Sequence, residues 1–518
     1  MGRGRSAAWR GLRRLLVGLG ARDTAGRRSG RDACSPGQDW TRRRVIQTLG
    51  MGALLGGCQF QGAGAPRVAI VGAGLAGLTA AYTLRKAGLI APVYDAAGRV
   101  GGRMLSVQGV LAPGVVWNLG GEFIDSDHRD ILALARELQI PLWDRTRVQP
   151  RTLDYFVGNQ SYSEAQVIEA LEPLVPRLRK DYEQVGDPIN SANPVAVTLD
   201  RLSLGAYLDQ LGVQGWLRRL LETAFVSEFG LEVDQQSALN FLLLVGLDVR
   251  EGFQVYGDSD ERYLLQGGSQ ALTDALAQQL ADQIHLEHGL VRLTGDAVSG
   301  YQLTLVGPAG RAMEVRADAV ILAVPFTTLR QVELQVDLPA QKRRCIAELG
   351  YGTHAKVGLG VKRRLWREQG SSGEAFSDAP FQMVWDSSEF QPGLQGGLTL
   401  FPGGAAGRAV GQQATETLLS NWLPDLEVIF PGLGDARNGR SGQFAWSTYP
   451  YSLGSYSCFQ PGQWTALGGA AGRPVGQIHF AGEHCSIESQ GYMNGAAETG
   501  RRAALGILGR VHSLLAKF

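Results

Sequence analysis

The stretch from Val68 to Met104 constrains the fold of this chain most. It opens with the apolar run Val68–Val71, which is typical of a buried parallel strand. A helical pattern follows over Leu78–Ala87 and is ended by Gly88, and a second apolar strand ends at Asp95. A strand, a helix and a second strand in this order predict a βαβ unit, which belongs to a parallel sheet.

Three glycines stand between the first strand and the helix at G-x-G-x-x-G spacing, namely Gly72, Gly74 and Gly77. The first allows a tight turn, the second lets the backbone approach a pyrophosphate, and the third lets helix and strand pack closely. The helix N-terminus then faces the phosphates. Asp95, about twenty positions further on, can accept hydrogen bonds from a ribose diol. The chain has 70 glycines, so chance matches are expected, but the complete unit predicts dinucleotide binding.

The residues after Asp95 narrow the choice of cofactor. Arg99, Gly101, Gly102 and Arg103 form an R-x-G-G-R element. Its glycines permit close approach of the backbone, and its arginines supply charge directed at phosphate. The pairing resembles the FAD-binding segment of the flavin amine oxidase superfamily, and not that of a nicotinamide dehydrogenase. That superfamily usually has Glu at the end of the second strand, and Asp95 should still reach the ribose.

Length and charge limit the number of domains and the kinds of partner that the chain can have. A chain of 518 residues suggests two domains, and 44% apolar with 19% charged residues is a globular composition. Residues 1–57 hold 12 Arg, no Lys and 3 Asp, which leaves 38 basic against 46 acidic residues in the rest. The body is therefore acidic, which disfavours a nucleic-acid partner and weakly favours the approach of cationic substrates.

The basic leader resembles an export signal. The segment Thr41–Gln47 contains three consecutive arginines, Arg42 to Arg44, and the uncharged stretch Val45–Gly57 begins directly after them. The pattern predicts a twin-arginine signal over residues 1–57, because the stretch is too short for a stable membrane span. Leu55 to Cys58 also resembles a lipoprotein cleavage box, which would place a lipid anchor on Cys58; ordinary cleavage nearby or an uncleaved anchor are the alternatives. We expect an exported protein that is periplasmic or membrane-anchored and faces the periplasm.

Cysteine spacing gives no sign of a metal site. The five cysteines are Cys34, Cys58, Cys345, Cys458 and Cys485, and none is in C-x-x-C spacing. We therefore expect no metal cluster or dithiol site. A disulfide between two of the last three is compatible with the sequence, which does not show one.

Apolar patterns outline the rest of the chain. We expect helices over 127–139, over most of 161–250 and, fully buried, over 238–244; a strand, turn and helix start over 262–269; a strand-like segment over 285–291; a hairpin of 301–306 with 312–316; a buried strand over 318–325; and small-residue surface loops at 403–407 and 468–472. Alternating strands and helices continue to about Trp446.

The C-terminal part adds a second strand-to-helix junction. The strand Ile478–Phe480 runs into Ala481-Gly482-Glu483, and Gly491-Tyr492-Met493 precedes a helix rich in Ala and Arg. This junction would place another helix N-terminus against the cofactor. Glu483 would bond a cofactor hydroxyl or a phosphate-linked water, unless it is a solvated loop carboxylate.

The two ends together resemble the flavin-containing amine oxidases, which include monoamine, polyamine and L-amino acid oxidases. The resemblance covers most of residues 66–512 and is weakest in the middle. It implies an α/β fold, in which a Rossmann-like FAD-binding domain (66–125, 260–330 and 445–512) is interleaved with a mixed α+β substrate-binding domain (126–259 and 331–444). It implies FAD contacts at Gly72, Gly74, Ala76, Gly77, Asp95, Arg99, Gly102, Arg103, Gly120, Gly121, Val291, Gly482, Glu483 and Met493, with Val291 near the adenine.

Three residues carry the chemistry by this resemblance. Lys356 looks like the lysine that holds a water at flavin N5, and Tyr456 and Tyr492 look like the two walls of the aromatic cage. Facing rings would favour an amine by stacking and cation–π attraction. Solvated or core positions are the alternatives for each. Ser455 stands where covalent monoamine oxidases have the cysteine that bonds the flavin, so the FAD should be non-covalent.

The substrate is less determined. Many L-amino acid oxidases have an Arg that clamps the substrate carboxylate where this chain has Glu122-Phe123. Glu122, Asp125 and Asp127 could instead recognise a cationic substrate end, although Asp125 or Asp127 could simply cap a helix. We expect FAD-dependent oxidative deamination of a basic L-amino acid (L-arginine or L-lysine) to the 2-oxo acid and ammonia, with oxygen or a quinone as acceptor. A monoamine or polyamine oxidase is the alternative, and a non-catalytic flavin-bearing lipoprotein is the alternative of another class.

Overall fold

The computed structural model describes residues 65–147, 153–246, 256–257 and 259–515. The predicted signal region, residues 1–57, and Cys58 lie outside these residues. Within them, no helix has both the length and the hydrophobicity that a membrane crossing requires. The three cysteines of the described part, Cys345, Cys458 and Cys485, are buried free thiols.

A five-stranded parallel sheet forms the centre of the cofactor side of the molecule. Its strands, in spatial order, are β10 (Ile284–His285), β2 (Val93–Tyr94), β1 (Val68–Val71), β14 (Ala319–Leu322) and β21 (Ile478–Phe480). All four residues of β1 and of β14 are buried. The predicted βαβ unit and parallel sheet are therefore confirmed, and the sheet draws its strands from three separate parts of the chain.

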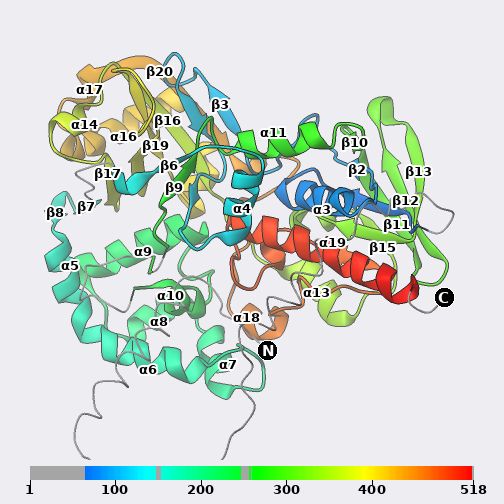
Figure 1. The fold of residues 1–518 in the computed structure, drawn as a ribbon. Helices are drawn as coiled ribbons and strands as arrows, with labels where there is room; N and C mark the ends of the chain where they lie inside the picture. The colour runs from blue at the N-terminus through cyan, green and yellow to red at the C-terminus, as the bar shows by residue number, and fades with distance from the viewer. Residues whose placement is uncertain (1–64, 148–152, 247–255, 258, 516–518) are drawn as a thin grey trace, which may run out of the picture.

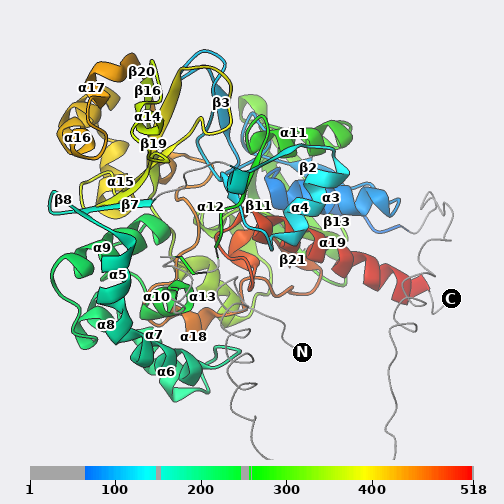
Figure 2. The same ribbon diagram turned by 60° about the vertical axis from the view of Figure 1, so that its left-hand side comes forward.

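Two helices from opposite ends of the chain pack together over this sheet. They are α3 (Leu75–Lys86) and α19 (Met493–Leu515), which lie side by side in Figures 1 and 2, in blue and red. The first begins at Leu75, three residues before the predicted start, because the glycine-rich segment itself forms the first helical turn and Gly74 is the N-cap. The apolar periodicity alone could not locate that turn.

A second, mostly antiparallel sheet flanks the central one. It consists of β13 (Ala312–Ala317), β12 (Gly300–Val306), β11 (Gly289–Asp296) and β15 (Glu333–Gln335). The predicted hairpin around residues 307–310 joins β12 to β13 and is confirmed. The helices α11 (Gln270–Gln279), α12 (Phe326–Leu329), α13 (Ala340–Glu348) and α18 (Gln463–Leu467) complete this side.

The other side of the molecule holds a seven-stranded sheet. In spatial order its strands are β20 (Arg437–Ala445), β16 (Ala355–Val361), β19 (Gly396–Leu400), β18 (Met383–Asp386), β17 (Glu374–Ser377), β7 (Leu153–Val157) and β8 (Gln160–Tyr162). Three short helices and one long helix lie near it in Figure 2, namely α14 (Leu365–Glu368), α15 (Gly404–Val410), α16 (Thr415–Ile429) and α17 (Leu433–Ala436). Every residue of β16 is buried, so this strand is a rigid support for side chains at its ends.

A helical region lies beneath this sheet in Figure 2. It contains α5 (Glu164–Leu171), α6 (Val175–Val185), α7 (Pro194–Arg201), α8 (Leu204–Gln210), α9 (Gly215–Phe229) and α10 (Ala238–Leu244). The predicted helical stretch and the buried helix at 238–244 are thereby confirmed for the described residues. Small strands link the two sides: β3 (Ser106–Gln108) pairs with β4 (Val116–Asn118), and β9 (Tyr263–Leu265) lies between β5 (Phe123–Ile124) and β6 (Leu142–Asp144).

Of the two predicted surface loops of small residues, the first is wrong, and the second is a turn that is partly buried. Residues 404–407 begin α15, where Gly404 and Gly407 are buried. In the second segment, Ala470 and Ala471 are buried beside the thiol of Cys485, which donates to the Ala471 carbonyl. In both places small side chains allow close packing, and the composition alone does not distinguish close packing from exposure. The division of the chain into two interleaved domains stays a prediction.

Candidate active site

One cavity of about 600 Å³ collects nearly all of the predicted site residues. This volume falls in the ordinary range for cofactor and ligand sites. Gly77 is the exception, since it lies inside α3. The predicted residues that line the cavity are Gly72, Gly74, Ala76, Asp95, Arg99, Gly102, Arg103, Gly120, Gly121, Glu122, Val291, Lys356, Tyr456, Gly482, Glu483, Tyr492 and Met493.

The turn between β1 and α3 presents backbone donors to this cavity. Gly72 has φ +105°, which an L side chain rarely adopts, and it lets the chain turn sharply out of the sheet. The N-cap Gly74 has no side chain to satisfy the free N–H groups of the first helical turn. Such groups attract anions, so the turn fits the pyrophosphate of a dinucleotide.

Asp95 fastens this turn to the second strand. Its carboxylate accepts hydrogen bonds from the backbone N–H groups of Ala73 at 2.6 Å and Ala97 at 2.8 Å. Burial raises the pKa of Asp95, and these two hydrogen bonds oppose that effect. The backbone therefore fixes the position of the Asp95 carboxylate. The contact of this carboxylate with the ribose stays a prediction.

The two predicted phosphate-directed arginines have protein partners. Arg99 donates to the carbonyl oxygens of Val100 at 3.0 Å and Gly102 at 2.6 Å. Arg103 donates to the Ser455 carbonyl at 2.6 Å and pairs with Glu483 at 2.7 Å. Arg99 thus stabilises its own turn, and Arg103 joins this turn to the segments of Ser455 and Glu483. The R-x-G-G-R spacing alone did not reveal these contacts.

Glu483 joins the two ends of the chain. Besides Arg103, it accepts hydrogen bonds from the backbone N–H and the hydroxyl of Ser457 and from the N–H of Gly491. Burial acts to raise its pKa, but the Arg103 charge and the hydrogen bonds hold the pKa below its ordinary value. Glu483 is therefore an ionised, buried carboxylate. The alternative of a solvated loop carboxylate is wrong.

Lys356 lies at the other end of the cavity, near the start of β16. The residue is 3% exposed, and its ammonium donates to the carbonyl oxygens of Asn118 and Gly120, both at 3.0 Å, and to Glu122 Oε2 at 2.7 Å. All three ammonium hydrogens thus have protein acceptors. The predicted role of holding a water stays a prediction, and Glu122 has Lys356 as its partner in place of a substrate cation.

Aromatic rings surround this end. The ammonium of Lys356 lies 5.0 Å from the Trp385 ring centre. His354 is stacked between Phe401 and Tyr456, with ring centres 4.7 Å apart on each side. Burial lowers the pKa of His354 to about 3, so it is neutral.

The two predicted cage tyrosines are each held by a neighbouring residue. The hydroxyl of Tyr456 donates to the Glu228 carbonyl, and the ring of Tyr492 meets His128 edge-on at 5.0 Å. Burial raises the pKa of both tyrosines well above the ordinary value, so both hydroxyls are neutral. The sequence suggested the two tyrosines, but it gave no sign of Glu228, Trp385 or Phe401, which come from the middle of the chain.

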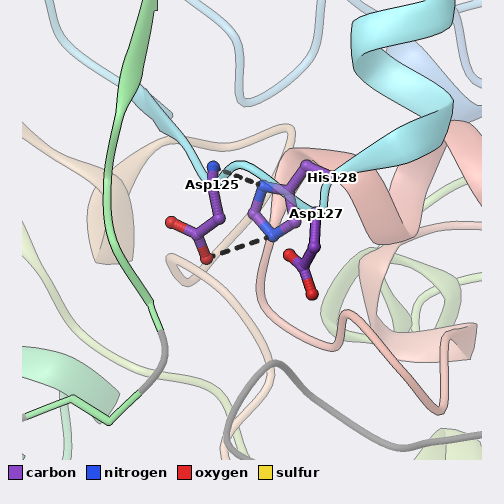
Figure 3. Close-up of side chains that lie close together, drawn as sticks. All are labelled: Asp125, Asp127 and His128. Carbon is purple, nitrogen blue, oxygen red and sulfur yellow. Dashed lines mark hydrogen bonds and ion pairs between the residues drawn. The ribbon is translucent and has the colours of Figure 1, made fainter. Parts of the chain in front are cut away.

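Asp125, Asp127 and His128 lie close together in an acidic cluster (Figure 3), and the ring of His128 contacts Tyr492. The backbone N–H of Asp125 donates to His128 Nδ1 at 3.0 Å, and the Asp125 carboxylate accepts from Ser259 and from the Glu261 N–H. The predicted helix cap at Asp125 or Asp127 is wrong, because α4 (Arg129–Glu137) has His128 as its N-cap. Asp125 instead ties the start of α4 to the segment at 259–261.

Comparison with known proteins agrees with this arrangement. Residues 75–508 match the family model described as flavin containing amine oxidoreductase. A Mycobacterium tuberculosis protein provisionally named flavin-containing monoamine oxidase AofH is 29% identical over 456 residues, covering 84% of this chain and 95% of its own. A Bacillus subtilis protein provisionally named L-amino-acid oxidase YobN is 26% identical over 466 residues, covering 84% and 93%.

A solved structure has the same fold. Cyclohexylamine oxidase from Brevibacterium oxydans IH-35A superimposes with a TM-score of 0.76 at 23% identity, covering 86% of this chain and 99% of its own. The cavity, the uncapped N-terminus of α3 and the buried ion pairs fit a flavin dinucleotide. The chain therefore belongs to the family of flavin-containing amine oxidoreductases, the FAD-dependent enzymes that oxidise amines or amino acids.

Proposed function

We propose that this enzyme oxidises an amine that lacks an α-carboxylate, which is the monoamine or polyamine alternative of the sequence analysis. The observation that supports this is that the cationic side chains lining the cavity are bonded to other protein groups. Arg99 and Arg103 bond backbone carbonyls and Glu483, and Lys356 is paired with Glu122. Among the described residues that line the cavity, each Arg and Lys side chain is already bonded to protein groups. A substrate carboxylate would have to compete with these partners for a counter-ion, and a buried charge without one is costly.

The chain's own residues would act by positioning. The rings of Tyr456 and Tyr492 would hold the amine between them, and the neutral His354 supports Tyr456 from behind. The Lys356–Glu122 pair holds the backbone at Gly120, which lines the cavity. When bound, FAD supplies the acceptor for the hydride that the amine loses. Ser455 replaces the cysteine that bonds the flavin in covalent enzymes. A serine cannot form that thioether, so the FAD would be held non-covalently. The Ser455 hydroxyl lies 2.6 Å from His354 Nδ1.

Matched substrate pairs test the proposal. L-Lysine and 1,5-diaminopentane differ only by the α-carboxylate, as do L-arginine and agmatine. We expect the decarboxylated member of each pair to bleach the flavin band of the anaerobic protein, and the amino acid to do so at least about 100-fold more slowly, the effect expected of an uncompensated buried charge. The measurement is the rate of absorbance loss after rapid mixing.

Faster bleaching by L-lysine or L-arginine than by its decarboxylated partner would contradict the proposal. That result would instead favour oxidative deamination of a basic L-amino acid. Equal flavin content in all samples is the control, since it keeps differences in loading from appearing as differences in rate.

A further inference from the structure

Glu228 is an acidic residue of the cavity that the sequence did not single out. It lies in the last turn of α9, is half-buried, and is one of the residues that line the cavity. The Tyr456 hydroxyl donates to the backbone oxygen of Glu228, which fixes this turn against the cage. Among the described residues, no donor contacts the Glu228 carboxyl group through a hydrogen bond or an ion pair. The group therefore has bonding capacity that no described residue uses.

The surroundings of Glu228 are acidic and aromatic. Burial, Glu261 and Asp125 all raise its pKa well above the ordinary value. Glu228 in turn is the charge that most raises the pKa of each cavity tyrosine, namely Tyr256, Tyr456 and Tyr492. Glu228 and these three tyrosines line the same cavity, and an acid together with aromatic rings stabilises an added positive charge.

The other acids near the cavity have partners. Glu122 is paired with Lys356 at 2.7 Å, and Asp125 accepts hydrogen bonds from Ser259 and Glu261. Glu261 contacts Arg145 at 3.4 Å. A cationic group that enters the cavity would therefore find its open carboxyl partner at Glu228, and not at the acids that the sequence suggested.

We infer that Glu228 binds a second cationic group of the amine substrate and so makes the enzyme selective for diamines over monoamines. This inference rests on the proposed oxidation of an amine without an α-carboxylate. One amine would lie between Tyr456 and Tyr492, and the distal ammonium would form a charge-assisted hydrogen bond with the Glu228 carboxylate. An alkyl end in the same place would leave the carboxyl group protonated and without a partner.

The test compares 1,4-diaminobutane with pentylamine, in which a methyl group replaces the distal ammonium. In Glu228→Gln we expect kcat/KM for the diamine to fall by about 10- to 100-fold, the effect of losing a hydrogen bond between charged groups, and kcat/KM for pentylamine to stay the same. Glu228→Leu should raise kcat/KM for pentylamine. Glu222→Gln is the matched control, because Glu222 lies on the same helix and pairs with Arg218 outside the cavity lining.

The pH dependence provides a second readout. In the wild type, the preference for the diamine should grow as rising pH ionises Glu228, and in Glu228→Gln the preference should not vary in this way. The titratable groups that interact electrostatically with Glu228 are Tyr256, Tyr456, Tyr492, Cys458, Glu261 and Asp125, and all are present in both proteins. Pentylamine shares the reacting amine, so the ratio of the two substrates removes the titration of that amine.

The possible failures are distinguishable. If the wild type oxidises pentylamine as well as the diamine, and Glu228→Gln leaves their ratio unchanged, the role of Glu228 is overturned while the proposed function stands. If the flavin of the wild type is bleached by L-lysine or L-arginine but by neither amine, the proposed function fails and this inference fails with it. Flavin content and melting temperature of each variant verify that the holoprotein is intact.

Discussion

Replacement of Gly77 with alanine is expected to give a protein that is purified with little flavin. An ideal Cβ at this position would lie 1.8 Å from the carbonyl oxygen of Gly72, and that oxygen belongs to the backbone of the β1–α3 turn. Backbone cannot move aside as a flexible side chain can, so the turn must distort. Strain of this kind costs at least about 1–3 kcal/mol, which implies a loss of about tenfold or more in FAD occupancy. The ratio of flavin to protein absorbance after gel filtration measures it.

Gly74→Ala is the matched control for this change. Its Cβ would meet no protein atom nearer than Gly102 Cα at 3.8 Å, which is an ordinary contact. We expect the Gly74→Ala apoprotein to melt at the wild-type temperature, but to bind FAD more weakly because the methyl group enters the approach to the N-terminus of α3. Wild-type flavin content in Gly77→Ala would show that the turn is not built as described.

Lys356→Met is expected to lower the free energy of unfolding strongly and also to slow reduction of the flavin by the substrate. The Lys356 and Glu122 side chains are 4% and 5% exposed, so the variant leaves a carboxylate buried without its cation. Removing one member of a buried pair costs about 3–5 kcal/mol of unfolding free energy. Loss of a positioned cationic donor at the cavity should also slow anaerobic bleaching of the flavin by about 100-fold. Denaturant unfolding and rapid mixing measure the two effects.

Two further variants separate stability from chemistry. Lys356→Met combined with Glu122→Leu removes both charges, so stability should return towards the wild-type value while bleaching stays slow. Lys362→Met is the surface control, because Lys362 follows the same strand but is exposed. An unchanged melting temperature in Lys356→Met would mean that the pair is not desolvated, and unchanged bleaching would remove Lys356 from the active site.

The two ends of the chain were predictable because their function depends on spacing. The glycine-rich turn, Asp95 and the A-G-E segment are local patterns, and each corresponds to an element of the central sheet. The partners of Arg103 and Glu483 were not predictable, since they meet across hundreds of residues. A residue type shows that a charge is present, and only the fold shows whether the charge faces a ligand or another side chain.

The middle of the chain resisted prediction for a different reason. Glu228, Trp385 and Phe401 come from α9, β18 and the end of β19, and they meet only when the seven-stranded sheet has packed on the helical region. Hydrophobic periodicity assigns such residues to buried faces, but it does not distinguish a core from the wall of a cavity. The opposite error occurred at Glu122 and Asp125, which the sequence suggested as ligands of a cationic substrate. In the structure Glu122 pairs with Lys356, and Asp125 accepts a hydrogen bond from the backbone of Glu261.

The order of the strands in the central sheet has a consequence for biosynthesis. β1 is made early, but its neighbour β14 pairs with β21, which begins at Ile478, and α3 packs on α19, which begins at Met493. At about 5–20 residues per second, a ribosome exposes the glycine-rich turn tens of seconds before these partners emerge. Until then β1 can pair with β2, but α3 lacks the helix that packs on it. Chaperone demand and loss to aggregation should therefore depend on how fast the last part of the message is translated.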